Sequence, residues 1–227
     1  MIIAKLLAVM IIAYLIGSIP FGLIITRRVA KVDIRQHGSG KIGATNVLRT
    51  AGKKAAALVV FLDTFKGGLA VLLAGTLFGV IGKDPGSWWL FRSAQALAAL
   101  SAMAGHNWSV FLKFQGGRGV ATFFGGLVAL SPVAALIGGE LALTGAILTR
   151  FASVGSLAGA VGTYTILVPL TIMNGFPIEY LAYALIGAIA IIISHRDNIA
   201  RLIAGRERKI GEKAKKIDSS PSAESMG

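Results

Sequence analysis

The sequence predicts an all-α integral membrane protein with seven transmembrane helices, an external N-terminus and a cytoplasmic C-terminus. Of its 227 residues, 55% are apolar and 15% are charged, and the mean hydropathy of +0.73 is well above that of soluble domains. Long apolar runs divide the chain, and basic residues concentrate in alternate connections between them. The net charge of +13 is therefore interpreted as a record of membrane orientation, not of nucleic-acid binding. Cysteine is absent, which excludes disulfides, thiolate metal sites and a cysteine nucleophile.

Seven hydrophobic runs are each interpreted as a membrane-crossing helix, because about 20 apolar residues are needed to cross about 30 Å of hydrocarbon. The runs are residues 3–26, 55–81, 88–105, 120–138, 139–152, 154–173 and 178–194. The first run is long enough to cross and lacks a small-residue cleavage pattern, so it is interpreted as a span and not as a secretory signal. Inside 120–173 only Gly138-Gly139-Glu140 and Arg150 offer turns, so the fifth helix is expected to be short.

The basic residues indicate the orientation of these helices, because lysine and arginine near the ends of a span resist translocation. With seven spans, the connections alternate between two sides. The side shared with the C-terminus carries 19 basic residues, and the opposite side carries three, Lys5, Lys83 and Arg92. This split predicts that the N-terminus is outside the cell and the C-terminus is cytoplasmic.

Two external connections are expected to be simple turns. Residues 82–86 precede Trp88 and Trp89, which are typical interfacial anchors, and residues 174–177 form the other turn. Glycine, serine, histidine, asparagine and arginine gather in the cytoplasmic connections, so the active site is expected at the cytoplasmic face. The chain is divided into a membrane domain, residues 1–205, and a polybasic, then disordered cytoplasmic tail, residues 206–227.

The first polar motif precedes the second span. Its glycines let backbone amides approach a ligand, its hydroxyl and amide side chains offer neutral hydrogen bonds, and its two cations add positive charge. The polar side chains are Ser39, Lys41, Thr45, Asn46 and Arg49. Together they form a candidate anion cradle. The alternative is a flexible loop whose charges serve only the orientation in the membrane.

The second polar motif, Gly116-Gly117-Arg118-Gly119, opens the fourth span. A glycine-rich turn at the start of a helix directs unpaired amides and the positive helix end toward one point, which suits a phosphate. The run lacks the full Walker pattern, so nucleotide binding is not predicted. The alternative is that the segment before it only anchors the chain at the membrane interface through Trp108 and Lys113.

The third polar motif follows the last span. At helical spacing His195 and Asn198 share a face, as do Asn198 and Arg201, and a histidine at the membrane boundary could accept a proton. The alternative for this histidine is a structural role. Asp63 and Lys66, inside the second span, are expected to form a neutralising ion pair, with the alternative that one of them reaches the cytoplasmic site.

Four motifs in this order resemble those of the bacterial acyl-phosphate:glycerol-3-phosphate acyltransferases, the PlsY family. The resemblance covers about residues 10–210, and its motifs are residues 17–22, 38–49 and 105–122 with His195, Asn198, Arg201, Gly205 and Glu207. It implies an enzyme of the bacterial inner membrane that transfers a fatty acyl group from acyl phosphate to the 1-hydroxyl of glycerol 3-phosphate. The products are lysophosphatidic acid and phosphate, in the first acylation step of phospholipid synthesis.

The resemblance also implies site residues. Those implied to bind substrate are Arg49, Thr45, Asn46, Gly116, Gly117, Arg118 and Gly119, and those implied to be catalytic are Ser39, His195 and Asn198. The glycine turn would hold phosphate through its amides. The family often has lysine at the position of Arg118, a difference that preserves charge but could shift geometry. No metal or cofactor is implied, and the expected partner is the soluble phosphate acyltransferase that makes acyl phosphate from acyl carrier protein.

The chemistry of these residues agrees with the resemblance. An acyl phosphate is a mixed anhydride with a good leaving group, so the enzyme mainly has to position two anions and stabilise developing charge. His195 is either a general base or an orienting group while a substrate phosphate takes the proton. The alternative function is a membrane transporter of a small organic phosphate anion, although transporters place broken helices near the membrane midplane.

The orientation predicts how single cysteines react, and the test is clean because the chain has no cysteine of its own. Cysteines that replace Lys41 and Ser220 should resist an impermeant thiol reagent in intact cells, whereas one that replaces Lys83 should react. The reverse labelling pattern would contradict the orientation.

Overall fold

The computed structural model describes residues 2–79 and 85–217, and these residues form a bundle of α-helices without a β-sheet. The helices are α1 (Ile2–Ser18), α2 (Phe21–Val29), α3 (Ala44–Ala51), α4 (Lys53–Phe78), α5 (Trp88–Asn107), α6 (Val120–Leu130), α7 (Pro132–Thr149), α8 (Ala152–Asn174), α9 (Ile178–Ser194) and α10 (Arg196–Ile203). Short 3-10 helices lie in the connections: η1 (Ile34–Gln36), η3 (Pro85–Ser87) and η4 (Val110–Leu112). The predicted all-helical class is confirmed.

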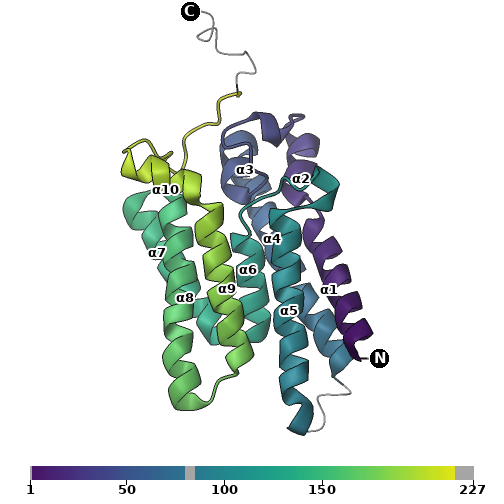
Figure 1. Cartoon of the computed structure of the whole chain (residues 1–227). Helices are drawn as coiled ribbons and strands as arrows, with labels where there is room; N and C mark the ends of the chain where they lie inside the picture. The colour runs from purple at the N-terminus through teal and green to yellow at the C-terminus, as the bar shows by residue number, and fades with distance from the viewer. Residues whose placement is uncertain (1, 80–84, 218–227) are drawn as a thin grey trace, which may run out of the picture.

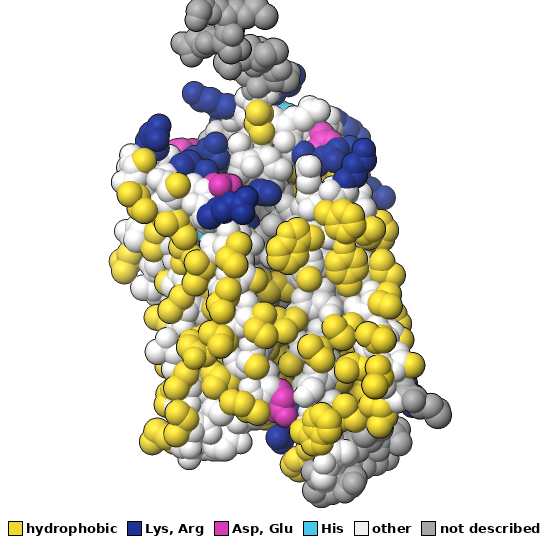
Figure 2. Space-filling view, viewed as in Figure 1, with side chains coloured by type: hydrophobic (Ala, Val, Ile, Leu, Met, Phe, Trp, Pro, Cys, Tyr) yellow, Lys and Arg dark blue, Asp and Glu magenta, His cyan; other side chains and the backbone are white. Residues whose placement is uncertain are grey.

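The long helices run side by side, and α2, α3 and α10 lie at one end of the bundle, called the polar end below (Figure 1). Basic side chains gather at this end, above a broad apolar surface (Figure 2). Large apolar side chains are exposed along the helices, including Phe61 on α4, Leu136 on α7 and Ile189 on α9. So extensive an apolar surface suits contact with lipid and not with water.

Four segments of the described residues are long and apolar enough to cross a membrane: Ile2–Val29, Lys53–Phe78, Pro132–Thr149 and Ala152–Asn174. A fifth is added if α9 and α10, which are bent by 58° relative to each other, count as one segment. The protein is therefore an integral membrane protein. The predicted span 3–26 is divided between α1 and α2 at Pro20, which has no N–H to continue a helix.

The region 120–173 is divided differently from the prediction. The break lies at Ser131 and not at Gly138-Gly139-Glu140, because the Ser131 hydroxyl accepts a hydrogen bond from an N–H in the first turn of α7, and Pro132 starts that helix. As a result α7 has 18 residues and contains Glu140 in its interior. The short helix is α6, whose 11 residues extend about 16 Å, half of the hydrocarbon thickness. The expectation of a short fifth helix was wrong.

Two glycines bring α6 directly against α4 near the polar end. A Cβ atom on Gly67 would collide with the backbone of Thr122, and one on Gly125 would collide with the backbone of Thr64. Only glycine permits so close an approach. This contact places the start of α6 beside the charged residues of α4.

The chain after α10 lies across the polar end. Residues 206–217 run from α10 to the loop before α3, where the Ile217 N–H donates to Gln36 O at 2.8 Å. Residues 218–227, expected to be disordered, lie outside the described residues, as does Lys83 in its predicted turn. The division of the chain at residue 205 stays a prediction.

Candidate active site

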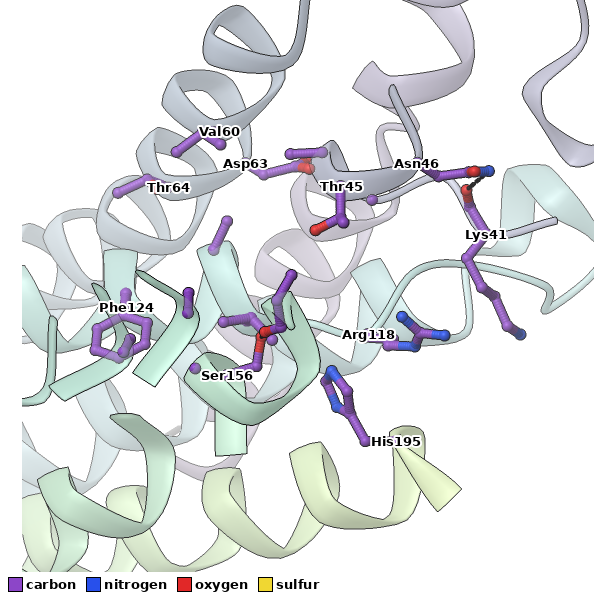
Figure 3. Close-up of a pocket in the computed structure, with 18 of the residues that line it drawn as sticks. Lys41, Thr45, Asn46, Val60, Asp63, Thr64, Arg118, Phe124, Ser156 and His195 are labelled. Atoms are coloured by element: carbon purple, nitrogen blue, oxygen red, sulfur yellow. Dashed lines mark hydrogen bonds between the residues drawn. The ribbon is translucent and has the colours of Figure 1, made fainter. Parts of the chain in front are cut away.

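A cavity of about 430 Å³ at the polar end is enclosed by residues of α3, α4, α6, α7 and α8 (Figure 3). Its polar lining consists of Ser39, Lys41, Thr45, Asn46, Arg49, Asp63, Thr64, His106, Arg118, Ser156 and His195. Its apolar lining includes Val60, Val120, Phe124, Ala142, Leu143 and Ala146. Six of the ten predicted site residues thus line one cavity, whereas Gly116, Gly117, Gly119 and Asn198 do not. The cavity combines a cationic part with an apolar wall.

The side chain of Asn46 holds the loop before α3 in shape. Its amide nitrogen donates to His37 O and to Lys41 O, at 2.9 Å each. Its oxygen accepts a hydrogen bond from the Ser39 N–H at 3.2 Å. These bonds show that Asn46 supports the loop in this conformation. Asn46 also lines the cavity, and its contact with substrate stays a prediction. Ser39 and Thr45 line the same cavity.

The glycine turn before α6 offers fewer free amides than predicted. The Gly116 N–H donates to Asn107 O at 3.1 Å, and the Gly117 N–H donates to His106 O at 2.9 Å. These two amides are therefore already bonded within the protein. A Cβ atom on Gly117 would also collide with Nε2 of the His106 imidazole. Glycine is needed at position 117 because there is no room for a side chain. Its backbone conformation does not require glycine, since its φ is not positive.

The free amides lie further along the chain than Gly116 and Gly117, at the start of α6. Gly119 has a φ of +78°, a left-handed conformation that favours glycine, and its carbonyl accepts the first helical hydrogen bond, from the Phe123 N–H at 2.8 Å. The N–H groups of residues 119–122 consequently have no acceptor within the helix. Val120 and Ala121 line the cavity, so an anion would be held at the positive end of α6.

Arg118 and His195 come from distant parts of the chain and both line the cavity (Figure 3). His195 Nδ1 lies 2.8 Å from Ile191 O. A carbonyl only accepts, so Nδ1 carries the proton and Nε2 is left as an acceptor. Burial and the neighbouring Arg118 charge lower the pKa of His195 to about 4, and the imidazole is therefore neutral at pH 7. Burial lowers the pKa of Arg118 to about 10, which leaves its guanidinium charged.

Arg49 reaches the cavity from the end of α3. Its Nη2 donates to Arg208 O at 3.0 Å and to Lys209 O at 3.2 Å. Burial, assisted by the charge of Arg208, lowers the pKa of Arg49 from its ordinary value, but an arginine remains charged near neutral pH. Arg49 therefore contributes a positive charge that the tail holds in place.

Glu207 is a supporting residue whose role its motif does not reveal. Its carboxylate accepts hydrogen bonds from Asn198 Nδ2 at 2.6 Å, Arg201 Nε at 2.8 Å and the Ser153 hydroxyl at 3.1 Å. Burial works to raise the pKa of Glu207, but the hydrogen bonds from Asn198 and Arg201 bring it below its ordinary value. Asn198 thus binds Glu207 and is not among the residues that line the cavity. Its catalytic role stays a prediction.

The predicted ion pair inside α4 is present and extends to a histidine. Lys66 Nζ lies 2.7 Å from Asp63 Oδ1, and both side chains are buried. The same Nζ lies 3.0 Å from His106 Nδ1 and donates to Ile19 O at 3.1 Å. Asp63 and His106 line the cavity, so the pair neutralises itself and also reaches the site. His106 was not among the predicted site residues, although it lies within the motif 105–122.

The chain is similar to known proteins over most of its length. A family model described as glycerol-3-phosphate acyltransferase matches residues 7–205. The glycerol-3-phosphate acyltransferase 3 of Dehalococcoides mccartyi (strain CBDB1) is 58% identical over 216 residues, which cover 95% of this chain and 100% of the relative. A glycerol-3-phosphate acyltransferase of Thermus thermophilus is 44% identical over 205 residues, 90% of this chain and 95% of the relative.

The fold is similar to that of two crystal structures of PlsY (YgiH), described as an integral membrane glycerol 3-phosphate acyltransferase. The glycerol 3-phosphate form has a TM-score of 0.78 and 37% identity, and the match covers 91% of this chain and 96% of that chain. The lysophosphatidic acid form has a TM-score of 0.76 and 36% identity, with 91% and 95% covered.

We expect Gly117→Ala to destabilise the protein, because the added Cβ would displace the His106 ring from its buried contacts. Overpacking of this kind costs about 1–3 kcal/mol and lowers the melting temperature by about 3–10 °C. Gly139→Ala is the matched control, because a Cβ at this helical position meets nothing within 4 Å. Thermal unfolding in detergent should show a lowered temperature for the first variant and an unchanged or raised one for the second. Equal melting temperatures would contradict the close packing at Gly117.

Proposed function

The chain belongs to the glycerol-3-phosphate acyltransferase family, and from this premise we propose that it transfers a fatty acyl group from acyl phosphate to the 1-hydroxyl of glycerol 3-phosphate. The products would be lysophosphatidic acid and phosphate. The cavity is the observation that carries this proposal. Its cationic part suits phosphate groups, and its apolar wall suits an acyl chain.

Arg49 and Arg118 are the proposed partners of the substrate phosphates. Both line the same cavity, and hydrogen bonds from a guanidinium to phosphate are charge-assisted and therefore strong. The hydroxyls of Ser39 and Thr45 would orient the glycerol part through neutral hydrogen bonds. The unpaired N–H groups at the start of α6 would supply further donors.

The reaction needs little more than this arrangement. The acceptor hydroxyl attacks the acyl carbon, the bond from that carbon to the phosphate oxygen breaks, and phosphate leaves. Arg118 and the amides of α6 would stabilise the negative charge that develops on the reacting oxygens. A conjugate acid with a pKa of about 4 makes His195 a weak base. We therefore assign His195 to orienting the hydroxyl through Nε2, with a phosphate oxygen taking the proton.

The acyl chain is proposed to lie along the apolar wall between α4, α6 and α7. Val60, Phe124 and Leu143 line it from these three helices. Val60 and Leu143 are 46% and 56% exposed, which would let a chain enter from the lipid. This arrangement keeps the reacting phosphates at the polar end while the tail of the donor stays in an apolar environment.

The membrane arrangement completes the proposal. We place the protein in the bacterial inner membrane with seven crossings, the polar end in the cytoplasm and the N-terminus outside. The basic side chains at the polar end support this orientation (Figure 2). The α6–α7 pair begins beside the cavity and returns to the polar end, where Arg150 O accepts from the Ile210 N–H at 2.8 Å. The proposed partner is the soluble phosphate acyltransferase that supplies acyl phosphate.

Transport of a small organic phosphate anion is the alternative function. A transporter site of this kind lies near the membrane midplane at the junction of inverted repeats. The charged lining residues of this cavity converge instead on the polar end of the bundle. We therefore do not propose transport.

Purified protein supplied with acyl phosphate and glycerol 3-phosphate should form lysophosphatidic acid, whereas acyl-CoA and acyl carrier protein should be poor donors. The products can be followed with labelled glycerol 3-phosphate, and a preparation of Arg49→Ala serves as the matched control. Equal turnover with acyl-CoA would refute the donor. No acylation with any of the three donors would refute the transfer itself.

A further inference from the structure

The segment after α10 is an ordered connection between the two sides of the polar end. Residues 206–217, called the C-terminal strap below, start beside α10 and finish beside the loop before α3. At the first end Glu207 holds Arg201 and Asn198. At the other end the strap pairs with the loop, since the Gly38 N–H donates to Lys215 O at 2.9 Å.

The middle of the strap contacts Arg49 through main-chain atoms. The Ala214 N–H donates to Arg49 O at 3.2 Å. The Arg49 guanidinium donates in turn to the carbonyls of Arg208 and Lys209. Arg49 Nε is buried and has no hydrogen-bond partner among the described residues. The strap therefore fixes one edge of the guanidinium and leaves donor capacity on a residue that also lines the cavity.

An arginine side chain has many rotamers, and a free one would lose this freedom each time it bound phosphate. Holding it in place before substrate arrives removes part of that loss. Carbonyl oxygens are suited to the task, because they accept from the guanidinium without neutralising the charge that attracts phosphate.

We propose that the C-terminal strap is a positioning element of the active site, in which the carbonyls of Arg208 and Lys209 orient Arg49 toward the phosphate of glycerol 3-phosphate. The inference rests on the proposed function, and in particular on Arg49 as a phosphate ligand. It assigns to the basic tail a role in substrate binding beyond membrane orientation. If the strap acted only through its positive side chains, a change in its backbone path would not affect substrate binding.

At one position of the strap, a substitution can disturb the backbone path without removing a side-chain contact. Gly211 has a φ of +93°, and a Cβ atom there meets nothing within 4 Å. Gly211→Val would strain the backbone without removing a side-chain contact. Gly175→Val is the matched control, because Gly175 also has a positive φ, +64°, and open space, but lies in the turn between α8 and α9.

Steady-state kinetics of the full-length variants tests the proposal. We expect Gly211→Val to raise the KM for glycerol 3-phosphate by about tenfold, with kcat and the KM for acyl phosphate little changed, because one charge-assisted contact loses its orientation. Gly175→Val should keep the wild-type KM values. An unchanged KM for glycerol 3-phosphate in Gly211→Val, or an equal rise for both substrates, would overturn the proposal.

A double-mutant cycle shows whether the strap acts through Arg49. Arg49→Ala alone should raise the KM for glycerol 3-phosphate by about 10-fold to over 100-fold, and adding Gly211→Val should then change it by less than about twofold. Independent, multiplying effects would contradict the proposal. Ala214→Pro, which removes the N–H that donates to Arg49 O, replaces Gly211→Val if that variant does not fold, and its expected outcomes are the same. If the wild-type protein transfers no acyl group, the proposed function is refuted. That outcome is distinct from the kinetic results that would overturn the role of the strap.

Discussion

The buried charge of Lys66 is the constraint on which the polar end depends. An ammonium group inside an apolar bundle has to find its partners within the protein, because lipid offers none. Lys66 finds them in Asp63 on its own helix, in His106 on α5 and in the carbonyl of Ile19 at the break between α1 and α2. Its contacts therefore fix three chain segments relative to one another, and removing one partner of such a buried pair costs about 3–5 kcal/mol.

The glycine turn is built on this cluster. His106 packs under Gly117, and its backbone carbonyl accepts the hydrogen bond of the Gly117 N–H. His106 thereby fixes the position of the turn. As a result, α6 starts at a point where its unpaired amides lie beside the cavity. Glu207 is a second supporting residue of the polar end, where it joins α10 to Ser153 on α8. The residues proposed to contact substrate are thus held in place by a second set of residues, of which Asp63 and His106 also line the cavity.

The sequence predicts the first set better than the second. Composition and charge identify the membrane class, and the spacing of glycines and cations identifies the loops that carry Ser39, Arg49 and Arg118. The partner that a polar side chain chooses is decided by packing, so the supporting positions of Asn46 and Asn198 were not foreseen. The predicted boundary between α6 and α7 at Gly138-Gly139 is wrong, because the capping Ser131 and the following Pro132 start α7 earlier. Glycines are common inside membrane helices where the helices pack together, so the two glycines do not mark a break. The ordered conformation of residues 206–217 could not be predicted from a periodic sequence pattern, because main-chain hydrogen bonds hold this segment in place.

Arg49 from α3 and Arg118 from the glycine turn are proposed to form one phosphate-binding centre, in which the strap holds Arg49. A structure of this protein with glycerol 3-phosphate bound would test this arrangement. We expect phosphate oxygens within about 3 Å of both guanidinium groups, a glycerol hydroxyl facing His195 Nε2, and Arg49 still bonded to the carbonyls of the strap. A phosphate bound away from these two arginines, or an Arg49 that leaves the strap to reach the phosphate, would contradict this arrangement.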